Sequence, residues 1–317
     1  MKFKHTLSLV TCVYGVEEYI EQYAHSIFGQ TCTDIEYIFV NDGTKDNSIQ
    51  ILERVIDEHY AHMRSNIIIL NQINQGLPLA RKSGISLAKG DYILFADPDD
   101  WLSPNAVEEI LTKADETDAD IIYFNLVKEY GHRQSIKREK HYTAETKELW
   151  IENIFNYKSF GYCVTKCFRR SLYTDNTIHT PILGMHEDIY LMSQIIFYAK
   201  SIVQMPKVLY HYRKTNKGSM CSQSSSTRHI ASSRNLLNLY QNYMQDIANS
   251  PIRRVANGIL FRAGWHALLH GYNFTKEYPW FVDAIRQAQM STRYQATLPQ
   301  QMLVKVAAKI SPKLFCR

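Results

Sequence analysis

Short β-type runs alternate with helical patterns through the first two hundred residues, and this alternation restricts the fold more than any other feature. Runs typical of buried strands lie at residues 6–14, 36–41, 66–70, 91–96 and 120–128. Helical patterns lie between them at residues 16–30, 46–59 and 77–88, and another begins at residue 103. Because strands separated by helices are typical of a sheet covered by helices, the sequence predicts an α/β domain.

The second half of the chain is less regular. Helical patterns at residues 145–156 and 187–199 are interleaved with β-type runs at 162–168 and 208–213. Residues 214–227 are rich in Ser and have no apolar period, and from residue 228 onward the pattern is helical. We therefore expect two parts, an α/β domain over residues 1–220 and a C-terminal helical region over residues 221–317.

Composition limits the class of protein. Apolar residues make up 45% of the 317 residues and charged residues 21%, which permits a buried core and argues against a disordered chain. No stretch approaches the roughly 18 to 20 apolar residues of a membrane-spanning helix, and the apolar run after Lys2 and Lys4 is too short for a signal peptide. The six cysteines lack zinc-site spacing. These features predict a cytoplasmic protein with reduced thiols.

Charge is distributed unevenly along the chain. Residues 201–317 contain 16 Lys and Arg but only three acidic residues, a balance of +13. Since the whole chain carries +5, residues 1–200 carry −8. This asymmetry favours an anionic neighbour for the C-terminal part, and a chance distribution of charge over helical surfaces is the alternative.

Four polar clusters follow predicted strands or begin the next element. In chain order they are Thr11, Val13 and Tyr14; Asn41-Asp42; Asp97-Pro98-Asp99-Asp100; and Glu187-Asp188. Ligands bind at the carboxyl edge of an open α/β sheet, although a single aspartate after a strand is usually only a turn residue. Together the clusters predict a ligand site at one edge of the sheet.

The third cluster is the most informative of the four. Three carboxylates within four residues repel one another, so this turn needs a compensating cation. Carboxylate oxygens suit Mg²⁺ or Mn²⁺ bound beside a phosphate, and a diphosphate leaving group needs its charge neutralised. A solvated acidic turn is the alternative, but it fits poorly between a buried strand and Trp101.

In this order the motifs resemble those of the family 2 glycosyltransferases, which have the nucleotide-diphospho-sugar (GT-A) fold. The resemblance covers about residues 6–220 and rests on five segments: LSLVTCVYGVEEYIEQYAHSIFGQT, FVNDGTKDNS, NQGLPLARKSGISLAKGDYILFADPDDW, GMHEDIYL and HYRKTNKGSM. Asn41 stands where the family has a first Asp. The resemblance implies a Rossmann-like mixed sheet with a C-terminal helical region. It also implies inverting, metal-dependent transfer of a sugar from a nucleotide sugar, such as a UDP-sugar, to an acceptor hydroxyl.

The resemblance further implies roles for individual residues on the donor side. These are Thr11, Val13 and Tyr14 beside the nucleotide base, Asp42 bonded to the base, Arg81 at the nucleotide or its phosphates, Asp97 at the ribose, and Arg213 and Ser219 over the diphosphate. Asp99 is the residue implied to bind Mn²⁺ or Mg²⁺. His211 is a second candidate metal ligand, and a packed or hydrogen-bonded histidine is the alternative for it.

On the acceptor side, the resemblance implies that Asp188 is the general base and that Glu187 orients or contacts the acceptor. Two acidic residues at a helix start also complement the helix dipole, and both interpretations can hold together. Lys166 resembles a family position near the acceptor. A surface lysine at a strand end is the alternative for this residue.

Three other classes of protein compete with the transferase. A dinucleotide-binding oxidoreductase needs a G-x-G-x-x-G segment after the first strand, where this chain has only Gly15. An Asp-x-Asp phosphatase would use Asp97 and Asp99 but would leave the other clusters without a role. A sugar-nucleotide-binding protein without catalytic activity is the third alternative, although Asp99 and Asp188 are both present.

The C-terminal region mixes aromatic residues with arginines, but it has no nucleic-acid motif and we expect no nucleic-acid partner. Acceptor binding, homo-oligomerisation and membrane attachment are the alternatives for its role. The tail at residues 300–317 has Lys305 and Lys309 on one helical face. Its apolar stripe consists of Leu303, Val306, Ala307 and Ile310.

A basic amphipathic helix of this kind predicts binding to an anionic membrane surface, and a last helix that caps the domain is the alternative. A basic C-terminal half without a spanning segment suits an enzyme at the inner face of the cytoplasmic membrane. We therefore expect a glycan or lipid-linked glycan acceptor in bacterial capsule, lipopolysaccharide or O-antigen synthesis.

Overall fold

The chain folds into two compact units. The computed structural model describes residues 3–138, 147–155, 161–181, 187–216, 226–246, 252–288, 298–310 and 315. Unit 1 comprises Met1–Tyr142, Tyr162–Ile182 and Gln194–Gly218, and unit 2 comprises Thr143–Gly161, Leu183–Ser193 and Ser219–Arg317. The boundary predicted at residue 220 lies beside the last of these transitions. Two earlier segments also belong to unit 2.

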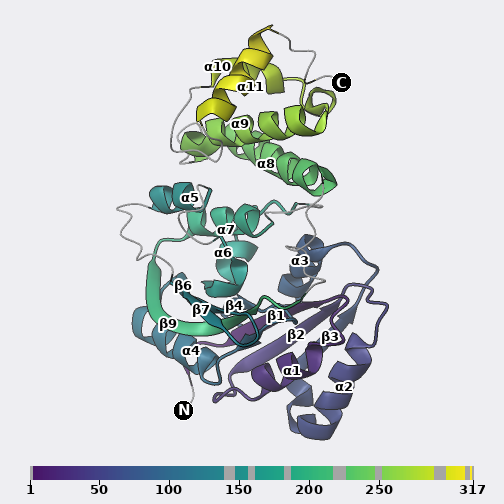
Figure 1. Ribbon diagram of the computed structural model, residues 1–317. Helices are drawn as coiled ribbons and strands as arrows, with labels where there is room; N and C mark the ends of the chain where they lie inside the picture. The colour runs from purple at the N-terminus through teal and green to yellow at the C-terminus, as the bar shows by residue number, and fades with distance from the viewer. Residues whose placement is uncertain are drawn as a thin grey trace. The chain divides into compact units, whose positions relative to one another are not determined.

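Within the described residues, unit 1 is built on a mixed sheet of nine strands (Figure 1). The strands are β1 (Leu7–Val13), β2 (Ile35–Asn41), β3 (Ile67–Asn71), β4 (Tyr92–Phe95), β5 (Trp101–Leu102), β6 (Ile121–Glu129), β7 (Gln134–Lys137), β8 (Lys166–Arg169) and β9 (Ile202–Arg213). They lie in the order β3-β2-β1-β4-β8-β6-β9-β5, with β7 paired to β6. β1 is parallel to β2 and β4, β2 to β3, and β6 to β9, whereas β5, β7 and β8 run antiparallel to their neighbours. The predicted α/β class and mixed sheet are confirmed.

The helices of unit 1 cover both faces of the parallel part of this sheet. They are α1 (Ile20–Phe28), α2 (Ser48–His59), α3 (Leu77–Leu87), α4 (Ala106–Thr117) and the short α6 (Ser171–Thr174). α1 and α2 lie on one face and α3 on the other, as right-handed crossovers require (Figure 1). α3 approaches the sheet closely, because a Cβ atom at Gly84 would lie 2.4 Å from Cγ1 of Val10. α1 buries the face that the sequence predicts, namely Ile20, Tyr23, Ala24, Ile27 and Phe28.

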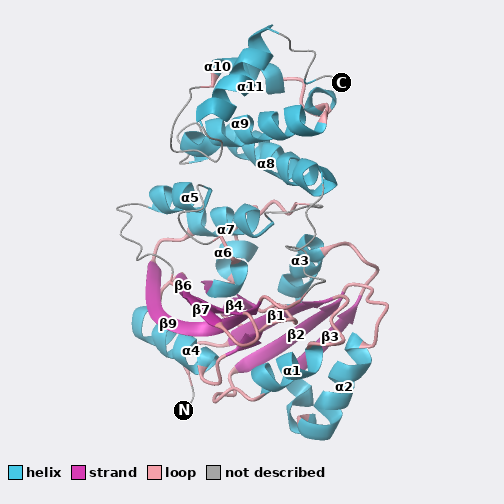
Figure 2. Cartoon of the chain, viewed as in Figure 1, coloured by secondary structure: helices cyan, strands magenta, loops and turns pink. Residues whose placement is uncertain are grey.

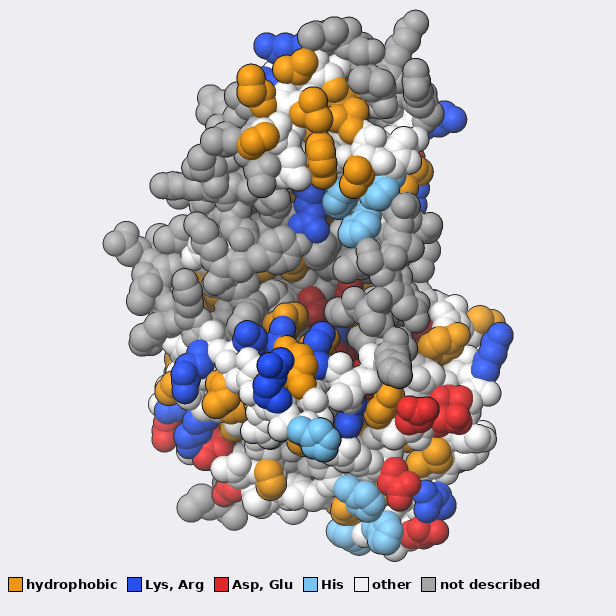
Figure 3. Space-filling model, viewed as in Figure 1, with side chains coloured by type: hydrophobic (Ala, Val, Ile, Leu, Met, Phe, Trp, Pro, Cys, Tyr) orange, Lys and Arg blue, Asp and Glu red, His pale blue; other side chains and the backbone are white. Residues whose placement is uncertain are grey.

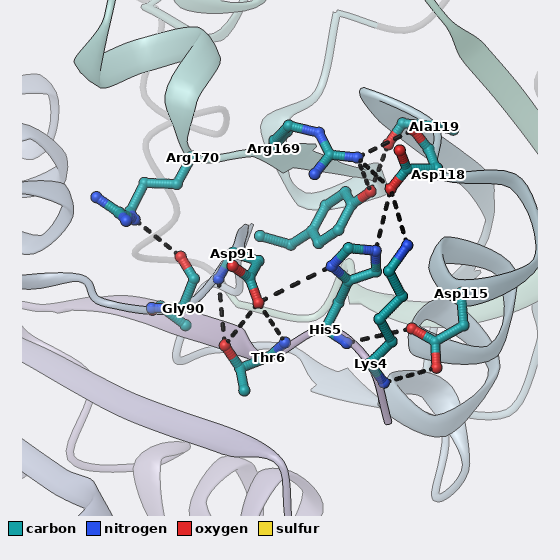
Figure 4. Close-up of polar contacts among 12 residues, drawn as sticks. Lys4, His5, Thr6, Gly90, Asp91, Asp115, Asp118, Ala119, Arg169 and Arg170 are labelled. Carbon is teal, nitrogen blue, oxygen red and sulfur yellow. Dashed lines mark hydrogen bonds and ion pairs between the residues drawn. The ribbon is translucent and has the colours of Figure 1, made fainter. Parts of the chain in front are cut away.

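A network of charged side chains ties the amino-terminal ends of β1 and β4 to β8 (Figure 4). The Arg169 guanidinium donates to Oη of Tyr92 and to Oδ1 of Asp118, both at 3.0 Å. His5 lies between two carboxylates, with Nε2 3.1 Å from Asp118 and Nδ1 3.9 Å from Asp91. The hydrogen bond from Arg169 lowers the pKa of Asp118 below its ordinary value. This network stabilises the edge of the sheet opposite the carboxyl ends of the parallel strands.

The structure differs from the sequence-based prediction in the later strands. β9 begins at Ile202 and not at residue 208, because Pro206 and Lys207 interrupt its apolar pattern and the ladder with β6 contains an irregularity near Asn125. β8 is shorter than predicted, since Cys163–Thr165 forms a 3₁₀ turn before it. β5 and β7 have only two and four residues, which is too short for periodicity to reveal.

Unit 2 is helical, as the sequence predicts for the C-terminal region (Figure 2). Its helices are α5 (Lys147–Phe155), the first part of α7 (Glu187–Tyr198), α8 (Ser226–Asp246), α9 (Ile252–His270), α10 (Phe281–Gln287) and α11 (Leu298–Ile310). α9 and α11 pack closely, because a Cβ atom at Gly264 would lie 2.5 Å from Cγ1 of Val304. None of the helices described in either unit is long and apolar enough to span a membrane.

The apolar stripe predicted for the tail is divided between two faces of α11. Ala307 is buried in unit 2, whereas Leu303 and Val306 are exposed. The side chain of Ile310 lies outside the described residues. The inner face of α11 is formed instead by Gln301, Val304 and Ala308, all fully buried. The helix therefore caps unit 2, and its outer face is apolar as well.

Candidate functional site

Three of the four predicted polar clusters meet at one edge of the sheet in unit 1. β1, β2, β3 and β4 are parallel to one another, so the loops that follow them leave the sheet on the same side. These loops contain Tyr14, Asp42, residues 72–76 and the acidic turn at residues 97–100. The grouping agrees with the rule that ligands of α/β sheets bind at this edge.

The acidic turn is anchored to β9 through Asp100. Oδ2 of this buried carboxylate accepts a hydrogen bond of 2.7 Å from Oη of Tyr210, and Oδ1 accepts one of 2.7 Å from the backbone N–H of Arg213. Oη of Tyr210 also accepts from the backbone N–H of Asp97 at 3.1 Å. Burial, followed by the charges of Asp99 and Asp97, raises the pKa of Asp100 well above its ordinary value. Asp100 is thus directed into the protein and positions the turn.

The other two carboxylates of the turn are partly exposed. Oδ1 of Asp97 lies 3.4 Å from Nη2 of Arg81, whose buried guanidinium covers the ring of Phe95 at 5.2 Å. Oδ2 of Asp99 accepts a hydrogen bond of 2.9 Å from Nδ2 of Asn216. The carboxylates of Asp97 and Asp99 are therefore accessible to solvent, whereas that of Asp100 is buried and holds the turn in place.

These two carboxylates fit part of a metal shell. Within the described ranges, no group of three or more His, Cys, Asp or Glu side chains is arranged to hold a metal ion. Mg²⁺ is typically bound by one or two carboxylates, with substrate phosphates and water completing the octahedron. The donor set of Asp97 and Asp99 fits a hard cation of this kind when a diphosphate supplies the remaining oxygens.

Arg213 places a cation beside the acidic turn. Its Nε donates to the backbone oxygen of Asp99 at 2.7 Å, and its Nη2 donates to Oε1 of Gln22 at 2.5 Å. The guanidinium also packs over the rings of Tyr19 and Trp101, at 5.0 and 4.8 Å. A guanidinium held by two hydrogen bonds and two aromatic rings is preorganised for an anionic ligand.

Asp42 organises the loop that leads into α3. Its buried carboxylate accepts three hydrogen bonds of 2.8 Å, from Nε2 of Gln72 and from the backbone N–H groups of Gln75 and Gly76. Gly76 has φ of +84°, a conformation that favours glycine. The contact of Asp42 with a nucleotide base stays a prediction.

The three residues of the first predicted cluster differ from one another in exposure. Thr11 and Val13 are fully buried, and Oγ1 of Thr11 is hydrogen-bonded to Oη of Tyr23. The backbone oxygen of Val13 accepts from the N–H of Asp42 at 3.1 Å. Tyr14, in contrast, is 52% exposed. Of the three side chains, that of Tyr14 is the one accessible to a nucleotide base in this conformation.

His211 has protein partners at both ring nitrogens. Nδ1 lies 2.8 Å from Oε1 of Glu129, and Nε2 lies 3.2 Å from Oγ of Ser103. The ring stacks on Trp101, with centroids 5.1 Å apart. Binding of a metal by His211 would require one of these contacts to break. The ring also borders a pocket of about 290 Å³, lined by Trp101, Glu129, Gly131, Gln134, His211, Arg213 and Thr215.

Lys166 is fully buried, so the alternative of a surface lysine is wrong. Its Nζ donates to the backbone oxygen of Tyr162 at 3.2 Å and to Oγ1 of Thr165 at 3.3 Å. An ammonium group is buried only where hydrogen bonds compensate for lost hydration. Lys166 therefore holds the 3₁₀ turn before β8, and its contact with an acceptor stays a prediction.

Glu187 and Asp188 are the first two residues of α7, in unit 2. Their negative charges lie at the helix N-terminus, which is favourable with respect to the helix dipole. Ser219 and His186 lie outside the described residues. The roles of the acidic pair and of Ser219 stay predictions.

Several residues that shape this edge were missed by sequence reasoning. Two of them contact the acidic turn, namely Tyr210 and Asn216. The other two contact Arg213, namely Gln22 and Trp101. The signal for Tyr210 is indirect: a tyrosine inside a buried strand needs a partner for its hydroxyl, and a buried aspartate needs a donor. The sequence alone does not pair these two residues.

Comparison with known proteins places these features in one family. The model of glycosyl transferase family 2 matches residues 8–176. EpsH of Bacillus subtilis (strain 168) is 35% identical over 214 residues, which cover 65% of this chain and 60% of EpsH. The minor teichoic acid biosynthesis protein GgaB of the same organism is 27% identical over 259 residues, 77% of this chain and 28% of GgaB. The matched part is thus less than two thirds of either relative.

Solved structures share the fold at low sequence identity. The crystal structure of S. aureus TarS 1-349 in complex with UDP-GlcNAc has a TM-score of 0.65 and 20% identity, covering 96% of this chain and 81% of that chain. The mannosyltransferase PcManGT from Pyrobaculum calidifontis, in complex with GDP-Man and Mn²⁺, has a TM-score of 0.56 and 12% identity, with coverage of 98% and 81%. At these identities the similarity establishes the fold alone.

Proposed function

Because the chain belongs to glycosyl transferase family 2, we propose that it transfers a sugar from a nucleotide sugar to an acceptor hydroxyl with inversion at the anomeric carbon. The observation that carries the proposal is the arrangement of the three carboxylates in the acidic turn at residues 97–100. Asp100 is buried and bonded to β9, while Asp97 and Asp99 face solvent beside Arg81 and Arg213. Carboxylates next to fixed guanidinium groups suit a cation bound to a diphosphate.

Asp99 would hold Mn²⁺ or Mg²⁺ at the diphosphate of the donor, and Asp97 would contact the ribose. When bound, this ion supplies charge neutralisation to the leaving diphosphate. Arg213 would contribute a second positive charge, and Ser219 would close over the same group. Arg81 would reach the nucleotide or its phosphates, and Tyr14 and Asp42 would lie near the base. A UDP-sugar is the proposed donor, and the TarS complex with UDP-GlcNAc supports that choice by fold.

Asp188 would accept the proton of the acceptor hydroxyl. As the proton is removed, the hydroxyl oxygen attacks the anomeric carbon and the nucleoside diphosphate leaves. Glu187 would orient or contact the acceptor. A single in-line displacement inverts the anomeric configuration, so an α-linked donor should give a β-linked product. A positioned general base typically contributes about 10²–10⁴-fold to the rate.

The direct test is release of nucleoside diphosphate from a panel of nucleotide sugars, with Mn²⁺, with Mg²⁺ and with excess chelator. We expect turnover with a UDP-sugar in the presence of either ion and none in chelator. Full turnover in chelator would remove the metal from the mechanism. Binding of nucleotide sugars without turnover, for any acceptor tested, would favour the catalytically inactive alternative.

Two variants separate the proposed roles. Asp99→Asn should abolish metal-dependent turnover, whereas Asp57→Asn, which changes an exposed aspartate on α2, should not affect it. Asp188→Asn should keep donor affinity in a thermal-shift assay but lose about 10²–10⁴-fold in transfer. If Asp188→Asn transfers normally and Glu187→Gln does not, the base is Glu187.

The acceptor that we propose is a glycan or lipid-linked glycan of a bacterial cell-surface polysaccharide. The sequence similarity to a teichoic acid biosynthesis protein supports this class of acceptor. Capsule, lipopolysaccharide and O-antigen glycans belong to the same class. Family membership overturns the Asp-x-Asp phosphatase alternative. We also propose that the enzyme acts in the cytoplasm at the inner face of an anionic membrane, and homo-oligomerisation is the competing role for unit 2.

A further inference from the structure

The inner face of α11 is packed against other parts of unit 2. Val304 and Ala308 are buried, and the absence of a side chain at Gly264 lets α9 come close to Val304. Arg286 donates through Nε to the backbone oxygen of Ala308 at 2.9 Å, and Lys305 donates through Nζ to that of Ala288 at 2.5 Å. α11 is therefore fixed to unit 2 by apolar packing and two charged hydrogen bonds.

The outer face of α11 exposes large apolar side chains, which is unusual for a helix at the surface. Met302, Leu303 and Val306 are 61%, 53% and 43% exposed. Positions i, i+1 and i+4 lie on one side of a helix, so these three side chains form one surface, called here the α11 face. A helix packed by one face normally presents charged and polar residues on the other.

The clustering of these residues is not typical of the rest of the surface. Three of the eight large hydrophobic side chains that are exposed among the described residues belong to two turns of α11. In Figure 3, hydrophobic side chains gather over the C-terminal helices of unit 2. Scattered apolar side chains on a surface need no explanation, whereas a contiguous group indicates an interaction site.

Positive charge accompanies the α11 face. Lys309 is exposed one turn beyond Val306, and the sequence continues with Lys313 and Arg317. Residues 201–317 as a whole carry 16 basic and three acidic residues. A second copy of the chain would bring the same positive charge to this face, which disfavours self-association there. A surface that combines apolar and anionic groups is the complementary partner.

We propose that the α11 face binds an anionic lipid bilayer, with Met302, Leu303 and Val306 entering the boundary between headgroups and acyl chains. Lys309 then contacts lipid phosphates. An apolar helix face flanked by lysines binds such interfaces reversibly and parallel to the membrane plane. The purpose of this binding, which is to bring the enzyme to a lipid-linked acceptor, rests on the proposed function. The binding itself does not depend on catalysis.

The test is flotation of the full chain with vesicles of phosphatidylcholine alone or with phosphatidylglycerol added. The test variant is Met302→Gln/Leu303→Gln/Val306→Gln, which changes exposed side chains only. Ile73→Gln is the matched control, because Ile73 is an 87% exposed hydrophobic residue of unit 1. Circular dichroism and thermal unfolding of the variants should match those of the unmodified chain, since no buried group is removed.

We expect the unmodified chain and Ile73→Gln to float with anionic vesicles, and less so at high salt, because screening shortens the reach of the lysine charges. The triple variant should partition about tenfold less, since the apolar contribution is lost. Lys309→Gln should weaken binding at low salt and make little difference at high salt.

Three outcomes would overturn the proposal. They are absence of flotation by the unmodified chain, equal flotation of the triple variant, and a concentration-dependent dimer that the triple variant abolishes. Transfer to a soluble acceptor, measured in parallel, should be unchanged in the triple variant. If the chain floats but does not transfer sugar, only the proposed function is refuted. If it transfers sugar but does not float, only the proposed membrane binding is refuted.

Discussion

Replacing Tyr210 with Phe removes one hydroxyl group that is hydrogen-bonded to the buried carboxylate of Asp100 and to the part-buried backbone N–H of Asp97. In the variant, Oδ2 of Asp100 loses its donor at 2.7 Å and the backbone N–H of Asp97 loses its acceptor at 3.1 Å. A buried polar group left without a partner costs about 1–3 kcal/mol, and a charged group costs more. We therefore expect Tyr210→Phe to lower the free energy of unfolding of unit 1 by about 3 kcal/mol.

The loss should depend on pH, because the pKa of Asp100 is already raised by burial. An acid whose folded pKa exceeds its unfolded value, about 3.9, stabilises the fold when protonated, and this contribution is lost as pH rises through the folded pKa. The hydrogen bond from Tyr210 favours the carboxylate form. Its removal raises the pKa of Asp100 further. The stability lost in Tyr210→Phe should thus increase as pH rises.

The assay is thermal unfolding of both proteins by circular dichroism at a series of pH values. A loss of about 3 kcal/mol corresponds to a Tm lower by about 6–12 °C for a unit of 150–250 residues. Tyr37→Phe is the control, since Tyr37 is equally buried but donates only to the backbone oxygen of Ile27. If both variants lose the same stability with the same pH dependence, the role assigned to the charge of Asp100 is wrong.

Three further predictions concern Gly84, His266 and Cys12. Gly84→Ala should lower Tm, because its Cβ would lie 2.4 Å from Val10 Cγ1 and overpacking typically costs about 1–3 kcal/mol. Burial, followed by nearby positive charges, lowers the pKa of His266 to about 4, so stability present above about pH 6.5 should be lost as pH falls toward 4. His266→Gln should flatten that slope in an acid titration followed by circular dichroism. Burial raises the pKa of Cys12 from 9.0 to about 12, so iodoacetamide should modify it about 1000-fold more slowly than an exposed thiol at pH 8, until urea unfolds the chain.

The parts of the fold that the sequence predicts well are those encoded by local periodicity. The buried face of α1 and the strand that runs into Asp97 are examples, because the spacing of apolar residues within one element decides them. The edge at which the polar loops meet is also predictable, since it follows from parallel strand order.

The direction of individual carboxylates could not be predicted in this way. Asp97, Asp99 and Asp100 are equivalent in the sequence, and the difference between them arises from Tyr210 and Arg213, more than a hundred residues later. Lys166 is a similar case, because its burial depends on the turn that precedes it and on the strands beside it.

For α11, the periodic pattern revealed apolar residues without showing which of them pack against α9. The sequence assigned Leu303 and Ala307 to one stripe, but they lie on different faces, one exposed and one buried. A helix with apolar residues on more than half of its circumference leaves its orientation to tertiary packing.

The alternation of the chain between the two units has a consequence for how such enzymes can diversify. The chain changes unit at residues 142, 161, 182, 193 and 218, so unit 2 is assembled from three separate stretches of sequence. An exchange of the residues after 218 between two relatives would pair one protein's Thr143–Gly161 and Leu183–Ser193 with the other's helices. Recombination at a single point would therefore produce a hybrid core. New versions of unit 2 are expected to arise by coordinated point substitution and not by domain shuffling.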